Sequence, residues 1–143
     1  MTLTRMTARR FVVDVLPALL YMGAIFYGGS IPLRTPPIDV GLPVDKVLHL
    51  LAFGGLQLLL VRALRQGPWR LSWSNRNWIA VAGASALGLL LEVYQSTLPY
   101  RSAELWDWIA DTLGALLAAA LLLLGARRFF ASSADAPPAT EPR

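Results

Sequence analysis

Residues 88–114 read GLLLEVYQSTLPYRSAELWDWIADTLG, and this stretch decides the fold. It joins two strongly apolar runs through a short turn around Pro99. Glu92, Asp107 and Asp111 lie within or beside these runs, and a charged side chain costs about 3 kcal/mol or more at the centre of a bilayer. Carboxylates in such positions are expected to face neighbouring helices. The stretch therefore predicts a helical bundle in a membrane.

The composition of the 143-residue chain supports this interpretation, since 55% of its residues are hydrophobic and 15% are charged. Soluble domains carry roughly 25% charged residues. The net charge of +4 comes mainly from Arg residues that flank the apolar runs, a pattern typical of topology signals and lipid contacts. We therefore expect membrane lipids as partners and no nucleic acid. The absence of Cys excludes disulfides, thiolate nucleophiles and Cys-based metal sites.

Four apolar runs are long enough to cross a membrane as helices, and they cover about residues 11–30, 45–64, 78–97 and 103–126. A Pro-rich loop separates the first two, and Asp45 stands at the expected N-cap of the second helix. We expect one all-α domain, a bundle of four transmembrane helices over residues 1–130, and a disordered tail over residues 131–143. A cleaved signal peptide is the alternative for the first run, because Arg9 and Arg10 precede it.

Lys and Arg residues are unequally divided between the two sides of such a bundle. Nine lie before the first span, in the second connection and directly after the fourth span at Arg127 and Arg128, whereas three lie in the other two connections. By the positive-inside rule both termini are cytoplasmic. The first and third connections then face the periplasm or the cell exterior.

Polar side chains gather at the predicted outer ends of three helices. They are Asp45, Lys46, His49, Glu92, Gln95, Arg101, Asp107 and Asp111. Residues three or four apart share one face of a helix, as Asp45 does with His49 and Asp107 with Asp111. The buried acids need neutralising partners. For Glu92 the candidates are Lys46, His49 and Arg101. For the pair of Asp residues, either one carboxyl is protonated, or Arg101, Lys46 or a metal ion neutralises them.

A cluster of acids, one His and basic groups at a membrane surface suits acid/base chemistry. Our candidates for catalysis are Glu92, Asp107, His49 and Asp45, with Glu92 or Asp107 as general acid or base and His49 as its partner. Our candidates for substrate binding are Lys46, Arg101, Gln95 and Asp111, with the two cations holding an anionic group such as a phosphate. A divalent cation held by His49 and the carboxylates is an alternative, and magnesium, manganese or calcium suits those donors better than zinc.

The ordered set Asp45-Lys46-x-x-His49, Glu92-x-x-Gln95, Pro99-x-Arg101 and Asp107-x-x-x-Asp111-x-x-Gly114 resembles the VanZ-like family of small bacterial membrane proteins. The resemblance covers about residues 45–120. It implies a four-helix protein of the bacterial inner membrane and, through the founding member of the family, a link to resistance against the glycopeptide teicoplanin. In the family pattern the position of Asp111 is often Asn.

Two classes of function follow from these residues. The first is an enzyme or binding site at the outer leaflet that acts on a lipid-linked or glycopeptide-related envelope molecule, with hydrolysis or transfer on a phosphate- or sugar-bearing lipid as the reaction. The second is a non-catalytic membrane protein whose polar cluster is a structural network or binds an antibiotic or a precursor. A transporter is a third alternative. Four spans are few for a transporter unless the chain forms a homo-oligomer.

Overall fold

The computed structural model describes residues 8–32, 44–65 and 71–134, and for residues 126–134 it describes the backbone alone. Its helices are α1 (Ala8–Arg10), the π-helical turn η1 (Phe11–Val15), α2 (Leu16–Ser30), α3 (Val44–Leu64), α4 (Trp73–Gln95) and α5 (Leu105–Ala134). No strand occurs in these ranges. Four helical segments are long and apolar enough to span a membrane, with α1, η1 and α2 forming the first. The predicted all-α class and the number of spans are confirmed.

Several boundaries differ from the predicted ones. Helix α4 begins at Trp73 because Ser72 caps it, accepting a hydrogen bond of 3.1 Å from the backbone N–H of Asn75. Helix α3 begins at Val44, so that Asp45 lies in the first turn and not at the N-cap, a position where the helix dipole still favours an acid. Helix α5 continues to Ala134, since no Gly or Pro follows Gly125 before that point. Most of the predicted disordered tail and the Pro-rich loop lies outside the described residues.

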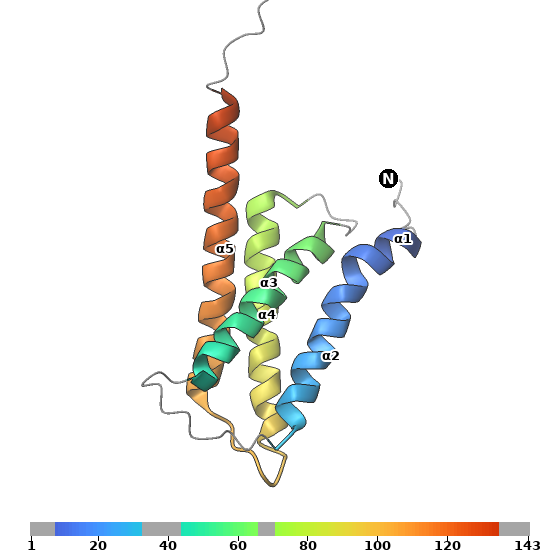
Figure 1. Ribbon diagram of the computed structural model, residues 1–143, viewed down its shortest axis with the longest axis vertical. Helices are drawn as coiled ribbons and strands as arrows, with labels where there is room; N and C mark the ends of the chain where they lie inside the picture. The colour runs from blue at the N-terminus through green and yellow to red at the C-terminus, as the bar shows by residue number, and fades with distance from the viewer. Residues whose placement is uncertain (1–7, 33–43, 66–70, 135–143) are drawn as a thin grey trace, which may run out of the picture.

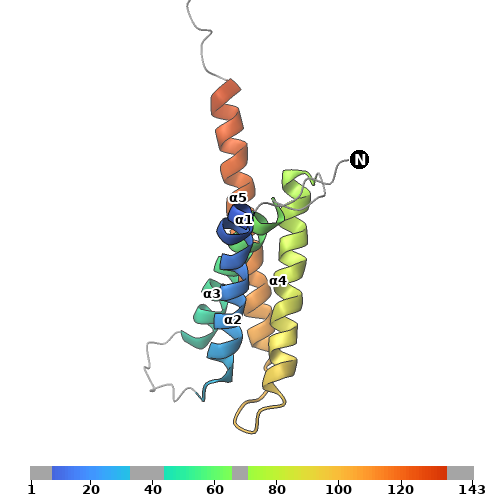
Figure 2. The same ribbon diagram turned by 90° about the vertical axis from the view of Figure 1, so that its right-hand side faces the viewer.

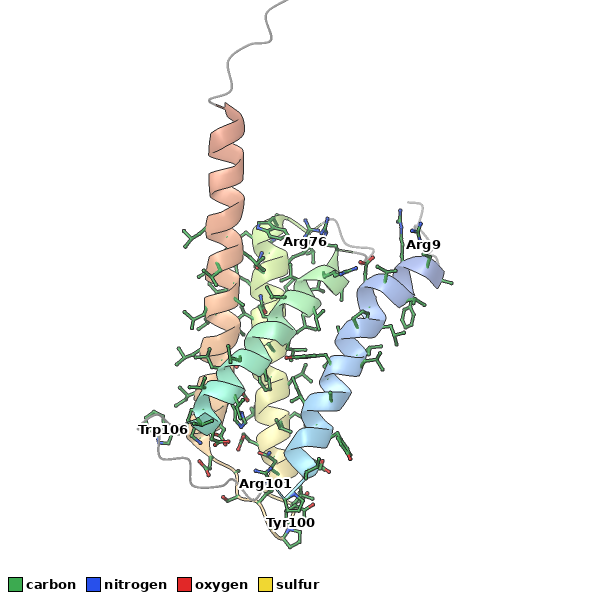
Figure 3. The ribbon with its side chains drawn as sticks, viewed as in Figure 1. Arg9, Arg76, Tyr100, Arg101 and Trp106 are labelled. Atoms are coloured by element: carbon green, nitrogen blue, oxygen red, sulfur yellow. The ribbon has the colours of Figure 1, made fainter. Side chains whose placement is uncertain are left out.

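The four spans alternate in direction (Figure 1). The beginning of the first span, the end of α3 and the start of α4 lie at one end of the bundle, from which α5 extends further (Figures 1 and 2). We call this the basic end, because Arg9 and Arg76 lie there (Figure 3). Arg101 and Trp106 lie at the opposite end, which we call the turn end (Figure 3). Which end faces the cytoplasm stays a prediction from the Lys and Arg distribution.

Small residues bring α3 and α5 into backbone contact where they cross. A Cβ atom added at Gly114 would collide with the carbonyl oxygen of Leu50, and one added at Gly54 would lie 3.3 Å from the carbonyl oxygen of Gly114. Such close approach is typical of helices packed within a membrane, where van der Waals contact drives association. The crossing fixes the first turns of both helices beside each other at the turn end.

The core of the bundle lies between α3, α4 and α5. Its fully buried members are Phe53, Leu56, Ala84, Leu91 and Ala115, and α2 covers it with partly buried side chains. Many large apolar side chains face outward, for example Leu51 at 62% and Leu121 at 71% exposure. An apolar outer surface around a core that contains small residues is the arrangement expected of a bundle surrounded by lipid.

Candidate functional site

All eight candidate residues come from the turn end, and four of them contact one another across helices. Asp45, Lys46 and His49 lie on the first turns of α3, Glu92 and Gln95 on the last turn of α4, and Asp107 and Asp111 on the first turns of α5, whereas Arg101 lies in the connection between α4 and α5. The interactions described below divide this set into a Lys46 group, a pair of His49 and Asp111, and three contacts at the ends of two helices.

Lys46 is surrounded by carboxylates. Its ammonium donates to Asp107, to Glu104 at 2.7 Å and to Asp45 at 3.2 Å. An ammonium has three N–H groups, so these three acceptors use all of them. Lys46 therefore ties α3 to the start of α5, and its predicted role in holding an anionic ligand stays a prediction.

His49 is held by a fully buried acid. Its Nδ1 lies 2.9 Å from Oδ1 of Asp111, whose side chain has no exposed surface, and its Nε2 lies 3.6 Å from Oδ2 of Asp107. An ionised carboxylate only accepts hydrogen bonds, so Nδ1 carries the proton of this pair when Asp111 is ionised. Gly88 makes room for the acid, because a Cβ atom there would lie 2.7 Å from Oδ2 of Asp111.

Glu92 closes the start of α5. Its Oε2 accepts a hydrogen bond of 2.6 Å from the backbone N–H of Glu104, the residue that precedes the helix. This contact resembles a capping interaction supplied by a neighbouring helix. No hydrogen bond or ion pair joins Glu92 to Lys46, His49 or Arg101 in the described structure, so the predicted partners of Glu92 were wrong. Its Oε2 instead meets a backbone N–H that the start of a helix leaves without an internal partner.

Arg101 and Gln95 hold the end of α2. Arg101 donates through Nη2 to the carbonyl oxygen of Ile31 at 2.8 Å, and Gln95 donates to that of Gly29 at 3.3 Å. The last carbonyl groups of a helix have no partner within it, which explains why they attract these donors. Arg101 forms no ion pair within the described residues, so its predicted pairing with Asp107 and Asp111 is wrong.

A cavity of about 140 Å³ lies beside this cluster, between α2, α3 and α4. Four candidates line it, namely Asp45, His49, Gln95 and Arg101. Arg101 has a buried Nε–H without a hydrogen-bond partner in the described structure. Leu48 also lines the cavity and is 56% exposed, so the cavity reaches the outer, apolar surface of the bundle. The site thus offers His49 and an unused Arg donor to a group that approaches from the lipid side.

Three candidates could hold a divalent cation, since Asp45, His49 and Asp107 each offer a ligand atom within 4.8 Å of the others. One nitrogen and two carboxylate donors fit such an ion in kind. However, the ammonium of Lys46 already binds both acids. A metal ion in this position has to displace Lys46.

The sequence interpretation missed two acids that form ion pairs. Glu104 joins the Lys46 group, and its position three residues before Asp107 on the same face was a usable signal. Asp14 pairs with Arg62 at the basic end, with 2.9 Å between Oδ1 and Nε. Asp14 is an acid within an apolar run, and that is the criterion by which Glu92 was selected, so the sequence did carry a signal for it.

Among known protein families, the family described as VanZ/LLP1 matches residues 4–126 of the chain. The match includes all four spans and every candidate residue. Searches of curated proteins and of solved structures found no match.

Proposed function

Because this multi-pass membrane protein belongs to the VanZ/LLP1 family, we propose that its turn end binds the polar head of a lipid-linked envelope molecule, with His49 exchanging a proton with it. The proposal places the turn end at the outer leaflet of the bacterial inner membrane, as the distribution of Lys and Arg predicts. The observation that carries it is the position of His49, which is held by buried Asp111 and lines a cavity together with Arg101.

The pair of His49 and Asp111 suits proton transfer. With Nδ1–H donating a hydrogen bond to the carboxylate, the ring keeps a lone pair on Nε2, and the buried acid fixes both the tautomer and the orientation of the ring. A His oriented in this way serves as a general base toward water or a hydroxyl group. The side chain of His49 is 17% exposed, so a ligand in the cavity can reach it.

Arg101 supplies the positive charge of the proposed site. Its Nη2 is used by Ile31, whereas its buried Nε–H has no partner in the described part of the chain. An unsatisfied donor on a charged group is costly to bury, and a phosphate or carboxylate oxygen of a ligand would satisfy it. Asp107, which lies near His49 and binds Lys46, is the second acid/base candidate.

The size of the cavity restricts the ligand. A volume of 140 Å³ corresponds to about five water molecules, whereas pockets for drug-sized ligands begin at about 300 Å³. A phosphate group or part of a sugar is compatible with this volume, and a whole glycopeptide is not. We therefore favour a phosphate- or sugar-bearing lipid as substrate, with hydrolysis or transfer at its head as the reaction.

The test compares His49→Ala and Arg101→Lys with Arg9→Gln, a control that removes a charge at the opposite end of the bundle. We would measure the yield of folded protein in detergent and teicoplanin susceptibility in a sensitive host. Normal yield with loss of the phenotype in the two site variants alone supports the proposal. Retention of the phenotype in His49→Ala contradicts the assigned role of His49.

A structural network is the second candidate, and the Lys46 group favours it. All three N–H groups of the ammonium are taken by carboxylates of α3 and the α5 start, which leaves none for a ligand. A satisfied polar network between spans can fix their packing. In that case His49→Ala and Arg101→Lys lower the yield of folded protein together with the phenotype.

A further inference from the structure

A second cavity, of about 380 Å³, lies at the basic end of the bundle and is separate from the site described above. Polar lining comes from Asp14, Arg62, Arg65 and Trp73, and Leu58 and Val61 are among its apolar lining residues. We propose that this cavity binds the phosphate group of an anionic phospholipid. The inference is independent of the function proposed for the turn end.

Asp14 holds one Arg of this cavity in place. It lies in the π-helical turn Phe11–Val15, and such turns within longer helices are frequent at functional sites. Its carboxylate accepts from Nε of Arg62 at 2.9 Å, with the Asp14 side chain 16% exposed and that of Arg62 47% exposed. No other side-chain hydrogen bond of Arg62 occurs in the described residues, so the outer N–H groups of the guanidinium are free for a ligand.

Further donors lie near the start of α4, where Trp73 lines the cavity and Arg76 contacts the Trp73 ring. Nε1 of Trp73 and Nε of Arg76 are buried, and neither has a hydrogen-bond partner in the described parts of the chain. The guanidinium of Arg76 lies 5.7 Å from the centre of the Trp73 ring, where a cation–π contact stabilises it. Arg65 lines the cavity, is exposed and forms no side-chain hydrogen bond or ion pair with the described residues. A ligand with several acceptor oxygens would satisfy these donors.

The charge of the site favours a phosphate. The two Arg residues that line the cavity, against the single acid Asp14, leave a formal charge of +1. Guanidinium groups bind phosphate oxygens in a bidentate manner. The apolar lining of Leu58 and Val61 continues the cavity along the bundle, which suits the acyl chains below a head group. A basic cavity with an indole at the end of a transmembrane bundle has the features expected for an anionic lipid.

Thermal unfolding of the full-length protein in a neutral detergent tests the proposal. The probes are phosphatidylglycerol, phosphatidylcholine and inorganic phosphate, each titrated into wild type and into the double variant Arg65→Gln/Trp73→Phe. We expect phosphatidylglycerol to raise the Tm of wild type more than phosphatidylcholine does. The double variant should bind phosphatidylglycerol about tenfold more weakly or worse, because two donors to a charged group are lost.

Arg9→Gln is the matched control, because it removes one positive charge at the same end from a residue that does not line the cavity. It should keep the wild-type response. An equal response to both lipids, or an unchanged affinity in the double variant, overturns the proposal. A wild-type shift produced in full by inorganic phosphate alone overturns the lipid as occupant. If the double variant does not fold, Arg65→Gln alone replaces it, since that side chain is exposed.

Discussion

Substitution of Gly114 by Ala should destabilise the bundle, because its Cβ atom would meet the backbone of α3. The added atom collides with the carbonyl oxygen of Leu50 and lies 2.9 Å from its Cα, and backbone atoms cannot yield as a flexible side chain can. Inserting a methyl group into a filled contact costs roughly 1–3 kcal/mol. Since the α3–α5 crossing places Lys46 beside Asp107 and His49 beside Asp111, separation of the helices should weaken both contacts.

Two further glycines make this a graded series. Gly54→Ala should cost less than Gly114→Ala, because its Cβ would stand 3.3 Å from the nearest atom, the carbonyl oxygen of Gly114. Gly125 lies on α5, the helix of Gly114, and a Cβ atom added there would have nothing within 4 Å. Gly125→Ala should therefore be neutral or stabilising by up to about 1 kcal/mol from helix propensity. Equilibrium unfolding in mixed micelles measures all three. A Gly114→Ala protein as stable as Gly125→Ala would refute the close crossing.

Three other predictions concern the polar cluster. Lys46→Met should lower the free energy of unfolding by about 1–3 kcal/mol, because it leaves the largely buried Asp107 without a cation, and Asp107→Asn in the same chain should restore part of it. Equal stability of the single and double variants in unfolding assays would contradict this. Asp111→Asn should keep the phenotype better than Asp111→Leu, since the Asn oxygen still accepts a hydrogen bond from His49. Indistinguishable phenotypes of the two variants in susceptibility assays would contradict the positioning role of Asp111. Manganese ions should leave the Tm of wild type unchanged but raise the Tm of Lys46→Ala, because the Lys46 ammonium occupies the same carboxylates, Asp45 and Asp107. A rise in the Tm of wild type would contradict this and show that the metal displaces Lys46.

The cluster also shows how a small bundle accommodates buried acids. Asp111 has no exposed surface, and three features make its burial tolerable: the ring of His49, the space left by Gly88 and the electrostatic effect of the Lys46 charge. Its Oδ2 atom keeps no hydrogen-bond partner in the described structure. A buried acid that keeps one acceptor oxygen unused beside an oriented His restricts which residues can surround it. The same requirement explains why Gly88 is a glycine, because any side chain there would contact the carboxyl group.

The number of spans, their alternation and the side on which the polar residues gather were predictable from the sequence, because length, hydropathy and turn residues are local properties of the chain. The spacing of Asp107 and Asp111, or of Asp45 and His49, correctly placed each pair on one helical face. The ordered motifs were also sufficient to indicate the family. Helix ends were less accurate, since caps such as Ser72 act through single hydrogen bonds.

Partners across helices were decided by the tertiary structure alone. Spacing along one helix says which side chains share a face, but not which neighbour that face meets. The rotation of α3 against α5 is set by backbone contact at Gly114, and it brings Lys46 to Asp107 and His49 to Asp111. Arg101, an equally good cation in the sequence, instead reaches the open carbonyl end of α2. The sequence determined where charge had to be neutralised, and the packing of small residues determined which group neutralises it.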